Sequence, residues 1–306
     1  MEIKRDLYLQ KMINKKNNKM IKIITGMRRC GKSYLLDPIF KNHLIDEGVK
    51  EDHIIKIDLD SIENKSLTDG LVLYNYVMNK IKDDNTYYVL LDEIQKVSNF
   101  ESVLNSFLRK KNLDVYVTGS NSKFLSTDII TEFRGRGDEI RVYPLCYGEF
   151  LSAYKGKELN AFKDYITYGG MPYILYLKTP EEKSQYLNSL FENTYINDII
   201  ERNGIQREDI LDLTINLLAS SVGSLTNPQK LLNTFVSNGY TGLNRNTINT
   251  YLNYLIDAFL INKSERYDIK GKKYISTPSK YYFTDVGLRN ARLNFRQQEE
   301  THLMEI

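Results

Sequence analysis

One stretch of eight residues constrains this chain more than any other. It runs from Gly26 to Ser33, reads GMRRCGKS, and lies between the apolar run 21–25 and the sequence Tyr34-Leu35-Leu36. Its two glycines let the backbone turn tightly, so that several N–H groups can point at one anion. The apolar run predicts a buried strand, and the residues after Ser33 predict a helix whose N-terminus adds positive dipole. The stretch therefore predicts a phosphate-binding loop between a strand and a helix.

The side chains of this loop indicate which phosphate compound it binds. Lys32 can reach the β- and γ-phosphates of a nucleotide, and the Ser33 hydroxyl can ligate Mg²⁺. ATP and Mg²⁺ are therefore the expected ligands. Cys30, beside Lys32 and a helix N-terminus, is expected to be a reactive thiol that ATP protects from alkylation. The residues expected to contact the nucleotide are Gly26, Arg28, Arg29, Cys30, Gly31, Lys32, Ser33 and Tyr34.

A second apolar run ends in two carboxylates. It reads YYVLLDE over residues 87–93 and predicts a buried strand followed by Asp92 and Glu93. Asp92 can hold the magnesium ion together with Ser33, and Glu93 can orient and deprotonate an attacking water. We therefore expect Lys32 and Glu93 to act in catalysis, and Ser33 and Asp92 to bind the metal.

Polar residues follow the next predicted strand, 114–119. In nucleotide hydrolases with a catalytic glutamate, the strand after the acids often lies beside the loop strand and places a polar sensor at the γ-phosphate. Thr118, Ser120 and Asn121 are candidates, and we favour Ser120 or Asn121. The alternative is that these residues only form a turn or cap the helix that starts near Lys123.

Two arginines separated by a glycine precede the fifth predicted strand, 139–143. Arg134 or Arg136, from the same or a neighbouring subunit, could stabilise charge on a transferred phosphate. Activity would then depend on a homo-oligomer. The alternative is a solvated basic loop.

Strands and helices alternate in the first half of the chain, which predicts a parallel α/β sheet. The strands expected are 21–25, 54–58, 87–92, 114–119 and 139–143, and the helices are 34–47, 71–82 and 100–110. After Pro144 the pattern is helical, over 149–154, 159–168 and 181–201, so we place a domain boundary near Tyr147. With 306 residues, of which 42% are hydrophobic, the chain can form two or more packed units.

Bulk composition excludes several classes of protein. A net charge of +3 is too small to indicate nucleic-acid binding by itself. The two cysteines cannot form a disulfide framework or a zinc site, and no signal sequence or membrane-spanning run is present, so we expect a cytoplasmic protein with no membrane partner.

Several segments together resemble one known family. They are GMRRCGKS, YYVLLDEIQ, VTGSNSKFLS, FRGRGDEIRVYPLCYGEF, YGGMP at 168–172 and KYYFTDVGLRNARL at 280–293. The whole chain is similar to prokaryotic AAA+ ATPases that join an origin-recognition-like ATPase module to a winged-helix region and a nuclease-like C-terminal domain of unknown function.

This resemblance implies a three-layer parallel sheet in AAA+ order with a helical lid, followed by a winged-helix domain. The domains implied are a P-loop ATPase domain at 1–147, a lid and linker at 148–206 and a winged helix at 207–293. Members of the family resume after a segment similar to residues 302–305, whereas this sequence ends at Ile306. We therefore expect residues 294–306 to be a tail that starts a truncated domain, and we assign no nuclease activity.

The implied winged helix contains a candidate DNA-reading helix. Residues 244–259 put Ile248, Leu252, Leu255 and Phe259 on one face, and leave Arg245, Asn246, Asn249 and Asn253 outward. The expected DNA contacts are Arg245, Asn246 and Asn249, with Lys270, Lys272 and Lys273 on the hairpin that follows. The alternative is that the helix packs against a protein partner.

Three functions remain open from the sequence. The first is an ATPase in which hydrolysis switches the orientation of the winged helix, and the second is a non-hydrolytic ATP-binding module that regulates or binds a partner. A pure binder does not need Glu93, which favours the first. A GTPase or phosphotransferase is weaker, because the segment 64–67, which reads NKSL, lacks the aspartate that would recognise guanine.

Overall fold

The computed structural model describes residues 3–119, 133, 135–265 and 278–296. The chain divides after Tyr143 into two compact units. We call residues 4–143 the α/β unit and the residues from Pro144 onward the helical unit. The division lies close to the boundary expected near Tyr147.

A five-stranded parallel sheet forms the centre of the α/β unit. Its strands are β1 (Ile21–Gly26), β2 (Ile54–Asp58), β3 (Tyr87–Asp92), β4 (Leu113–Thr118) and β5 (Gly137–Val142). Their order is β2-β3-β4-β1-β5, and every neighbouring pair is parallel. The parallel α/β fold expected from the sequence is confirmed. Because β4 separates β1 from β3, the end of β4 lies between the phosphate loop and the acids.

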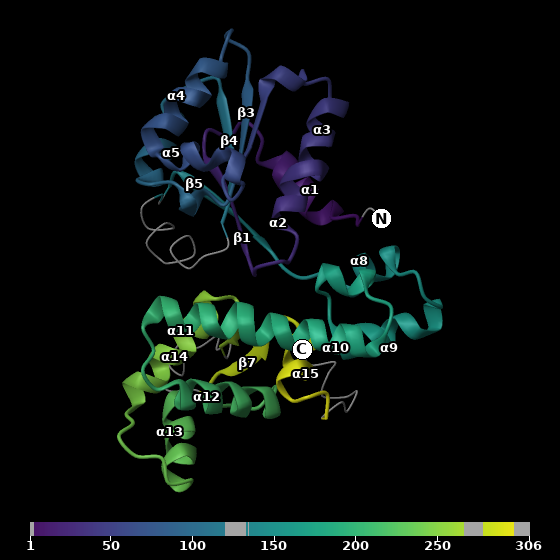
Figure 1. Cartoon of the computed structure of the whole chain (residues 1–306), viewed down its shortest axis with the longest axis vertical. Coiled ribbons are helices and arrows are strands. Elements are labelled where there is room, and N and C mark those ends of the chain that lie inside the picture. Colours follow the sequence, from purple (N-terminus) through teal and green to yellow (C-terminus); the bar gives the residue numbers. More distant parts are fainter. Residues whose placement is uncertain (1–2, 120–132, 134, 266–277, 297–306) are drawn as a thin grey trace, which may run out of the picture. The chain divides into compact units, whose positions relative to one another are not determined.

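Helices cover both faces of this sheet. Figure 1 shows α1 and α3 on one side and α4 and α5 on the other. α5 buries one apolar stripe, Phe100, Val103, Leu104 and Phe107, and each such side chain contributes roughly 2 kcal/mol. The helical segments are α1 (Asp6–Asn14), α2 (Lys32–Tyr34), a π-helical turn (Leu35–Phe40), α3 (Lys41–Asp46), α4 (Gly70–Lys80) and α5 (Phe100–Leu108), with short 3₁₀ turns at Glu51–His53, Ile62–Thr68 and Ile94–Lys96.

The helix expected over residues 34–47 is not continuous. Asp37 has φ −144° and ψ 118°, which are extended angles. It precedes Pro38, and the proline ring disfavours helical angles in the residue before it. The prediction of one helix was therefore wrong at this point.

A buried ion pair joins β1 to β4 near the edge where these strands begin. The Lys22 ammonium group is bonded to Asp114 and to the carbonyl oxygen of Met20, the latter at 3.0 Å. The Tyr116 hydroxyl lies 3.2 Å from the same carboxylate. Burial lowers the pKa of Lys22, and the negative charge of Asp114 opposes that shift. The phosphate loop lies at the opposite edge of the sheet.

The helical unit begins with a chain of helices and no strands. These are α8 (Tyr147–Ala153), α9 (Glu158–Tyr168), α10 (Pro180–Ser189) and α11 (Asn197–Asn203), with a 3₁₀ turn at Pro172–Tyr176 and a π-helical stretch at Leu190–Ile196. Thr179 and Glu182 form a capping box at the start of α10, and Pro180 occupies its first turn. Thus local sequence determines where the helix expected from residue 181 begins.

Two further helices and a strand pair follow α12 (Glu208–Ser220). They are α13 (Pro228–Ser237), α14 (Arg245–Asp257) and the antiparallel strands β6 (Ile261–Ser264) and β7 (Lys280–Phe283). The side chains of Asn227 and Asn244 cap α13 and α14 by accepting backbone N–H groups at 2.8 and 2.9 Å. Local sequence therefore determines where α13 and α14 begin.

The YGGMP segment packs against α15 (Val286–Arg292), the last helix described. Asp285 accepts the N–H of Gly170 at 2.7 Å, and the Gly170 carbonyl oxygen accepts the N–H of Leu145 at the same distance. A Cβ atom on Gly170 would lie 2.1 Å from the Leu145 carbonyl oxygen, so no larger residue fits there. The expected lid and the residues after it therefore belong to one compact unit. No described helix is both long and apolar enough to span a bilayer.

Candidate functional site

The phosphate loop, Gly26 to Ser33, turns through left-handed backbone angles. Gly26, Arg29 and Gly31 have φ values of 138°, 62° and 98°. A Cβ atom on Gly26 would lie 2.1 Å from the carbonyl oxygen of Val142 in β5. Position 26 therefore needs glycine both for its backbone angles and for the close approach of the neighbouring strand.

Lys32 supplies a positive charge inside this loop. Its side chain is buried, and Nζ donates to the carbonyl oxygens of Gly26 at 3.0 Å and Met27 at 2.7 Å. Charge-assisted bonds to an anion are stronger than bonds to neutral carbonyls. A phosphate oxygen would therefore be a better partner for this ammonium group than the two carbonyls are.

Carboxylates gather at the ends of β2 and β3. Asp58 is the register partner of Asp92, and Glu93 follows it directly. Burial raises the pKa of Asp92, and the negative charges of Glu93 and Asp58 raise it further. Hydrogen bonds from the hydroxyls of Thr118 and Ser33 oppose this rise. A divalent cation would relieve the crowding of negative charge. Asp58 was not among the residues expected here, although its place at the end of a strand is the signal that identified Asp92.

Glu93 leaves β3 through a sharp turn. Its φ and ψ are 57° and 49°, which are left-handed angles, and its side chain is half-buried. The Glu93 N–H donates to the Thr118 hydroxyl at 3.0 Å, and the Gln95 side-chain amide bonds to its carboxylate. The sequence did not single out Gln95 for this position. The turn carries the glutamate out of the strand on the same edge of the sheet as the phosphate loop.

The residues favoured as sensors, Ser120 and Asn121, lie outside the described residues. Thr118, considered with them, is the last residue of β4 and is fully buried. Its hydroxyl donates to the Asp92 carboxylate and accepts the Glu93 N–H. Thr118 therefore faces the acids of β3.

The structure separates Arg136 from the phosphate loop of its own chain. Its carbonyl oxygen accepts the N–H of Ile21 at 2.9 Å, and its guanidinium donates to Asn105 in α5 at 3.1 Å. Ile21 and Gly26 are the two ends of β1, which are about 16 Å apart. This placement favours action on a neighbouring subunit over action on its own loop, and the role of Arg136 stays a prediction. Arg134 lies outside the described residues.

The remaining loop residues differ in exposure. Arg29 and Ser33 are exposed, and Arg28 and Tyr34 are half-buried. Cys30 is fully buried, with Sγ 3.6 Å from the Val142 carbonyl oxygen. Because alkylation needs an accessible thiolate, the expectation of a reactive thiol at Cys30 was wrong.

These residues fit ATP and Mg²⁺ by their chemistry. A turn of backbone N–H groups, a buried ammonium group and a helix start suit phosphate. A hydroxyl bonded to a carboxylate, beside two further carboxylates, suits a cation that prefers oxygen ligands.

Known proteins match this chain along most of its length. A family model described as an AAA domain matches residues 18–151, which include all five strands of the parallel sheet. A protein of Haemophilus influenzae, named only as uncharacterized, is 36% identical over 293 residues, covering 94% of this chain and 72% of that protein. The chain belongs to the AAA+ ATPase family.

A second relative and a second family model extend the match of this AAA+ chain. The uncharacterized protein MJ1544 of Methanocaldococcus jannaschii is 29% identical over 319 residues, covering 97% of the chain and 66% of that relative. A model described as a domain of unknown function (DUF8612) matches residues 159–299, within the helical unit.

Solved structures similar to the AAA+ chain include two proteins of Aeropyrum pernix. The ORC2 protein, in ADPNP–ADP complexes, is 11% identical with a TM-score of 0.45, covering 94% of this chain and 90% of that one. The ORC1 protein in complex with DNA is 10% identical with a TM-score of 0.35, covering 99% and 94%. Similarity at these TM-scores is too low to carry an argument about the AAA+ chain.

A second candidate surface of the AAA+ chain lies on α14. Ile248, Leu252 and Leu255 in this helix, and Phe259 beyond its end, are buried. Arg245, Asn246, Asn249 and Asn253 are exposed, so the two faces are divided as the sequence predicted. Lys270, Lys272 and Lys273 lie outside the described residues.

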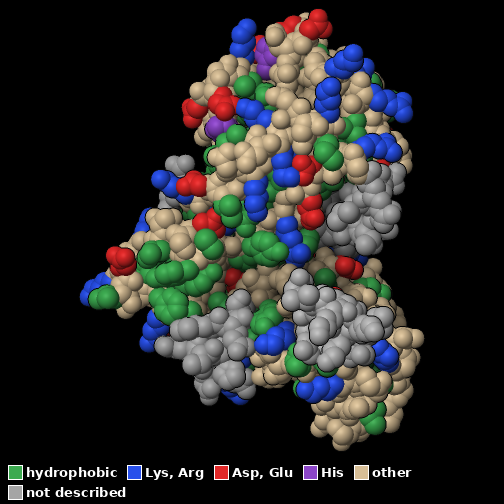
Figure 2. All heavy atoms as spheres, turned by 180° about the vertical axis from the view of Figure 1, so that it is seen from behind, with side chains coloured by type: hydrophobic (Ala, Val, Ile, Leu, Met, Phe, Trp, Pro, Cys, Tyr) green, Lys and Arg blue, Asp and Glu red, His purple; other side chains and the backbone are tan. Residues whose placement is uncertain are grey.

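The surface charge of the AAA+ chain is mixed. Figure 2 shows Lys and Arg side chains interspersed with Asp and Glu over the α/β unit on the face in view. This distribution agrees with the small net charge of +3.

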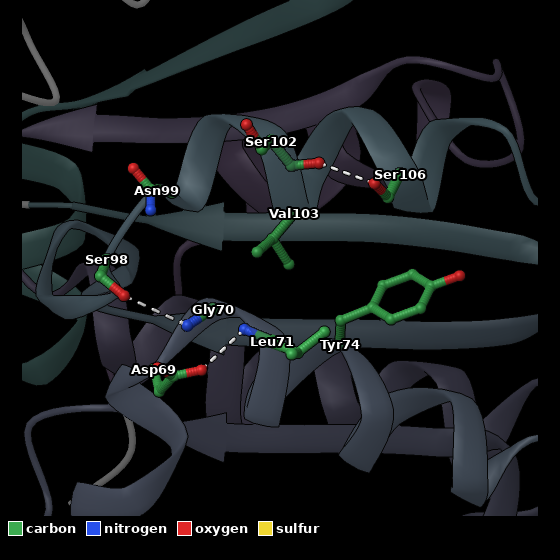
Figure 3. A pocket seen from close by; sticks show the side chains of 9 residues that line it. All are labelled: Asp69, Gly70, Leu71, Tyr74, Ser98, Asn99, Ser102, Val103 and Ser106. Carbon is green, nitrogen blue, oxygen red and sulfur yellow. Dashed lines mark hydrogen bonds between the residues drawn. The ribbon is translucent and has the colours of Figure 1, made fainter.

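A cavity of about 520 Å³ lies where α4 and α5 begin. Figure 3 shows Leu71, Tyr74 and Val103 among its lining residues, with serine hydroxyls and Asn99 around them. The Gly70 N–H donates to Ser98 at 3.3 Å, and the Leu71 N–H donates to Asp69 at 2.9 Å. The lining of this cavity contains no basic side chain, so it does not suit a phosphate, and it shares no residue with the phosphate loop.

Proposed function

We propose that this AAA+ chain is an ATPase that binds ATP with Mg²⁺ at the phosphate loop and hydrolyses it. The observation that carries the proposal is the place of Glu93, which turns out of the end of β3 directly after the buried Asp92, on the edge of the sheet where the phosphate loop and Ser33 lie. A site built only to hold nucleotide needs the hydroxyl and the aspartate but has no use for the adjacent glutamate.

Each group has a distinct role in this proposal. The backbone N–H groups of the loop bind the phosphates and Lys32 stabilises their negative charge, while Ser33 and Asp92 would hold Mg²⁺. The bound metal neutralises charge on the phosphates. Glu93 orients a water molecule and accepts its proton as the water attacks the γ-phosphate.

The proposal is tested by phosphate release from ATP with Mg²⁺, measured across protein concentration. We expect Glu93→Gln to bind ATP and to lose at least roughly tenfold in kcat, because it keeps the side-chain shape and removes the base. Lys32→Ala should lose ATP affinity. Glu181→Gln, at an exposed position in α10, is the matched control and should behave as wild type. Tight ATP binding without turnover at any concentration would instead support the non-hydrolytic regulatory module.

We further propose that α13, α14 and the strand pair β6–β7 form a winged helix that contacts DNA and changes orientation with hydrolysis. The exposed guanidinium and amide groups of Arg245, Asn246 and Asn249 support this proposal, because such groups meet base edges and phosphates. Lys270, Lys272 and Lys273, which lie between β6 and β7 in the sequence, would add phosphate contacts.

A further inference from the structure

Thr118 connects both acids of the site through one hydroxyl group. Its Oγ1 donates to Oδ1 of Asp92 and accepts the N–H of Glu93 at 3.0 Å. A hydroxyl has one hydrogen and two acceptor positions, so both bonds exist together. The side chain is fully buried at the end of β4, the strand between β1 and β3. Thr118, at the end of β4, therefore forms hydrogen bonds with both acids at the end of the neighbouring strand β3.

The bond to Glu93 acts on its backbone. Left-handed angles are unfavourable for a residue with a side chain and persist where surrounding contacts hold them. Glu93 follows the last residue of β3, and its N–H donates to the Thr118 hydroxyl. The hydroxyl thus stabilises the turn that sets the direction in which the glutamate side chain leaves the strand.

The bond to Asp92 acts on its carboxylate. The Thr118 hydroxyl donates to this carboxylate, which is buried and directly precedes Glu93. Thr118 approaches from β4, so its hydroxyl fixes the orientation of the carboxylate from the neighbouring strand.

We propose that Thr118 is a positioning residue that holds Asp92 for the metal and Glu93 for the attacking water through its single hydroxyl. The proposal rests on the ATPase function proposed above. It differs from a sensor of the γ-phosphate, because the hydroxyl already bonds to the two acids and acts on the reaction through them.

The test compares Thr118→Val, which keeps the shape and removes the hydroxyl, with Thr118→Ser, which restores the hydroxyl. In Thr118→Val we expect kcat to fall roughly 10- to 100-fold, with KM for ATP changed less than about threefold and a higher Mg²⁺ concentration needed for half activation. Thr118→Ser should recover kcat to within about threefold of wild type. The control is Thr214→Val, in which a buried threonine hydroxyl that donates to Ile210 at 2.7 Å is lost from α12.

The outcomes separate this proposal from the ATPase proposal. Wild-type kcat in Thr118→Val, or a loss that Thr118→Ser does not recover while both variants melt like wild type, overturns the role of Thr118. If wild type itself shows no turnover, the ATPase proposal fails. Binding of a fluorescent ATP analogue against Mg²⁺ concentration then decides, since an unchanged Mg²⁺ requirement in Thr118→Val overturns the contact with Asp92.

Discussion

Asp285 is a carboxylate enclosed by backbone. It accepts N–H groups from Gly170 and Leu288, and a Cβ atom on Gly169 would lie 2.2 Å from its Oδ1. Burial raises the pKa of Asp285 to about 6, although these backbone hydrogen bonds favour the charged form. The group that joins the YGGMP segment to α15 therefore changes charge in the mildly acidic range.

This shift predicts how stability depends on pH. The folded-state pKa of Asp285 is about 6, against an ordinary value of 3.8, so the folded state holds the proton more tightly. The resulting stabilisation is complete below the ordinary pKa and is lost as pH rises through about 6, a change of roughly 3 kcal/mol. Asp285→Asn has no such titration. We would measure urea unfolding at several pH values. As pH rises through about 6, the free energy of unfolding of wild type should fall relative to that of Asp285→Asn.

The comparison with the variant removes the contribution of other titrating groups. His53, for example, bonds to Asp52 and Asp83, and the bond to Asp52 is the main cause that raises its pKa. Both proteins contain this histidine, so its effect cancels in the difference. A difference in unfolding free energy that stays constant from about pH 4 to about pH 7 would contradict the assignment to Asp285.

Residue identity indicated some members of the candidate site and not others. The sequence analysis identified the GMRRCGKS loop and the Asp92-Glu93 pair because each is a recognisable motif at the end of a predicted strand. Asp58 also ends a predicted strand but has no second acid beside it, and Gln95 follows no strand end directly. Parallel register brings Asp58 to Asp92, and the left-handed turn brings Gln95 to Glu93. Burial of Cys30 likewise depends on β5 lying beside β1, which the local sequence does not specify.

At the scale of elements, α14 presents one polar face. We predict that Arg245→Ala weakens binding to duplex DNA several-fold and reduces the slope of log affinity against log salt by about 1, if the guanidinium meets a phosphate. The measurement is fluorescence anisotropy with labelled duplex across salt concentration.

The matched control for Arg245 is Lys157→Ala. Lys157 is exposed and precedes α9 in the same unit, so its loss changes the net charge equally without altering the α14 face. Equal weakening by the two substitutions would indicate a general charge effect and would count against a DNA-reading α14.

Strands were predicted more accurately than helices in this chain. The five apolar runs match β1 to β5 within two residues at each end. The runs of the inner strands β1, β3 and β4 are almost wholly buried, whereas β2 and β5 at the two sides of the sheet include exposed residues. The expected helix over 34–47 failed at Asp37, where Pro38 outweighs the apolar spacing. The π-helical stretch at Leu190–Ile196 lies within the helix expected over 181–201, where the sequence predicted no change of helix type.

At the scale of the whole molecule, the place of Arg136 predicts that activity requires more than one subunit. Its carbonyl oxygen is bonded at the start of β1, whereas the phosphate loop follows the end of that strand. We expect Arg136→Ala to bind ATP normally and to lose at least roughly tenfold in kcat, because a neighbouring subunit lacks its arginine.

Mixing two inactive variants tests this prediction directly. Arg136→Ala keeps its phosphate loop, and Lys32→Ala keeps its arginine, so an oligomer of both should regain part of the phosphate release. Activity that stays absent in the mixture, with oligomers formed, would show that Arg136 does not act between subunits.

The ion pair between Lys22 and Asp114 also constrains how this sequence can evolve. A substitution at either position alone leaves a buried charge without its counter-charge, at a cost of roughly 3 to 5 kcal/mol. Two apolar residues of similar size could occupy the same space, but any route to them by single mutations passes through such an intermediate. Substitutions at these two positions, 92 residues apart, are therefore coupled, so strands β1 and β4 do not evolve independently of each other.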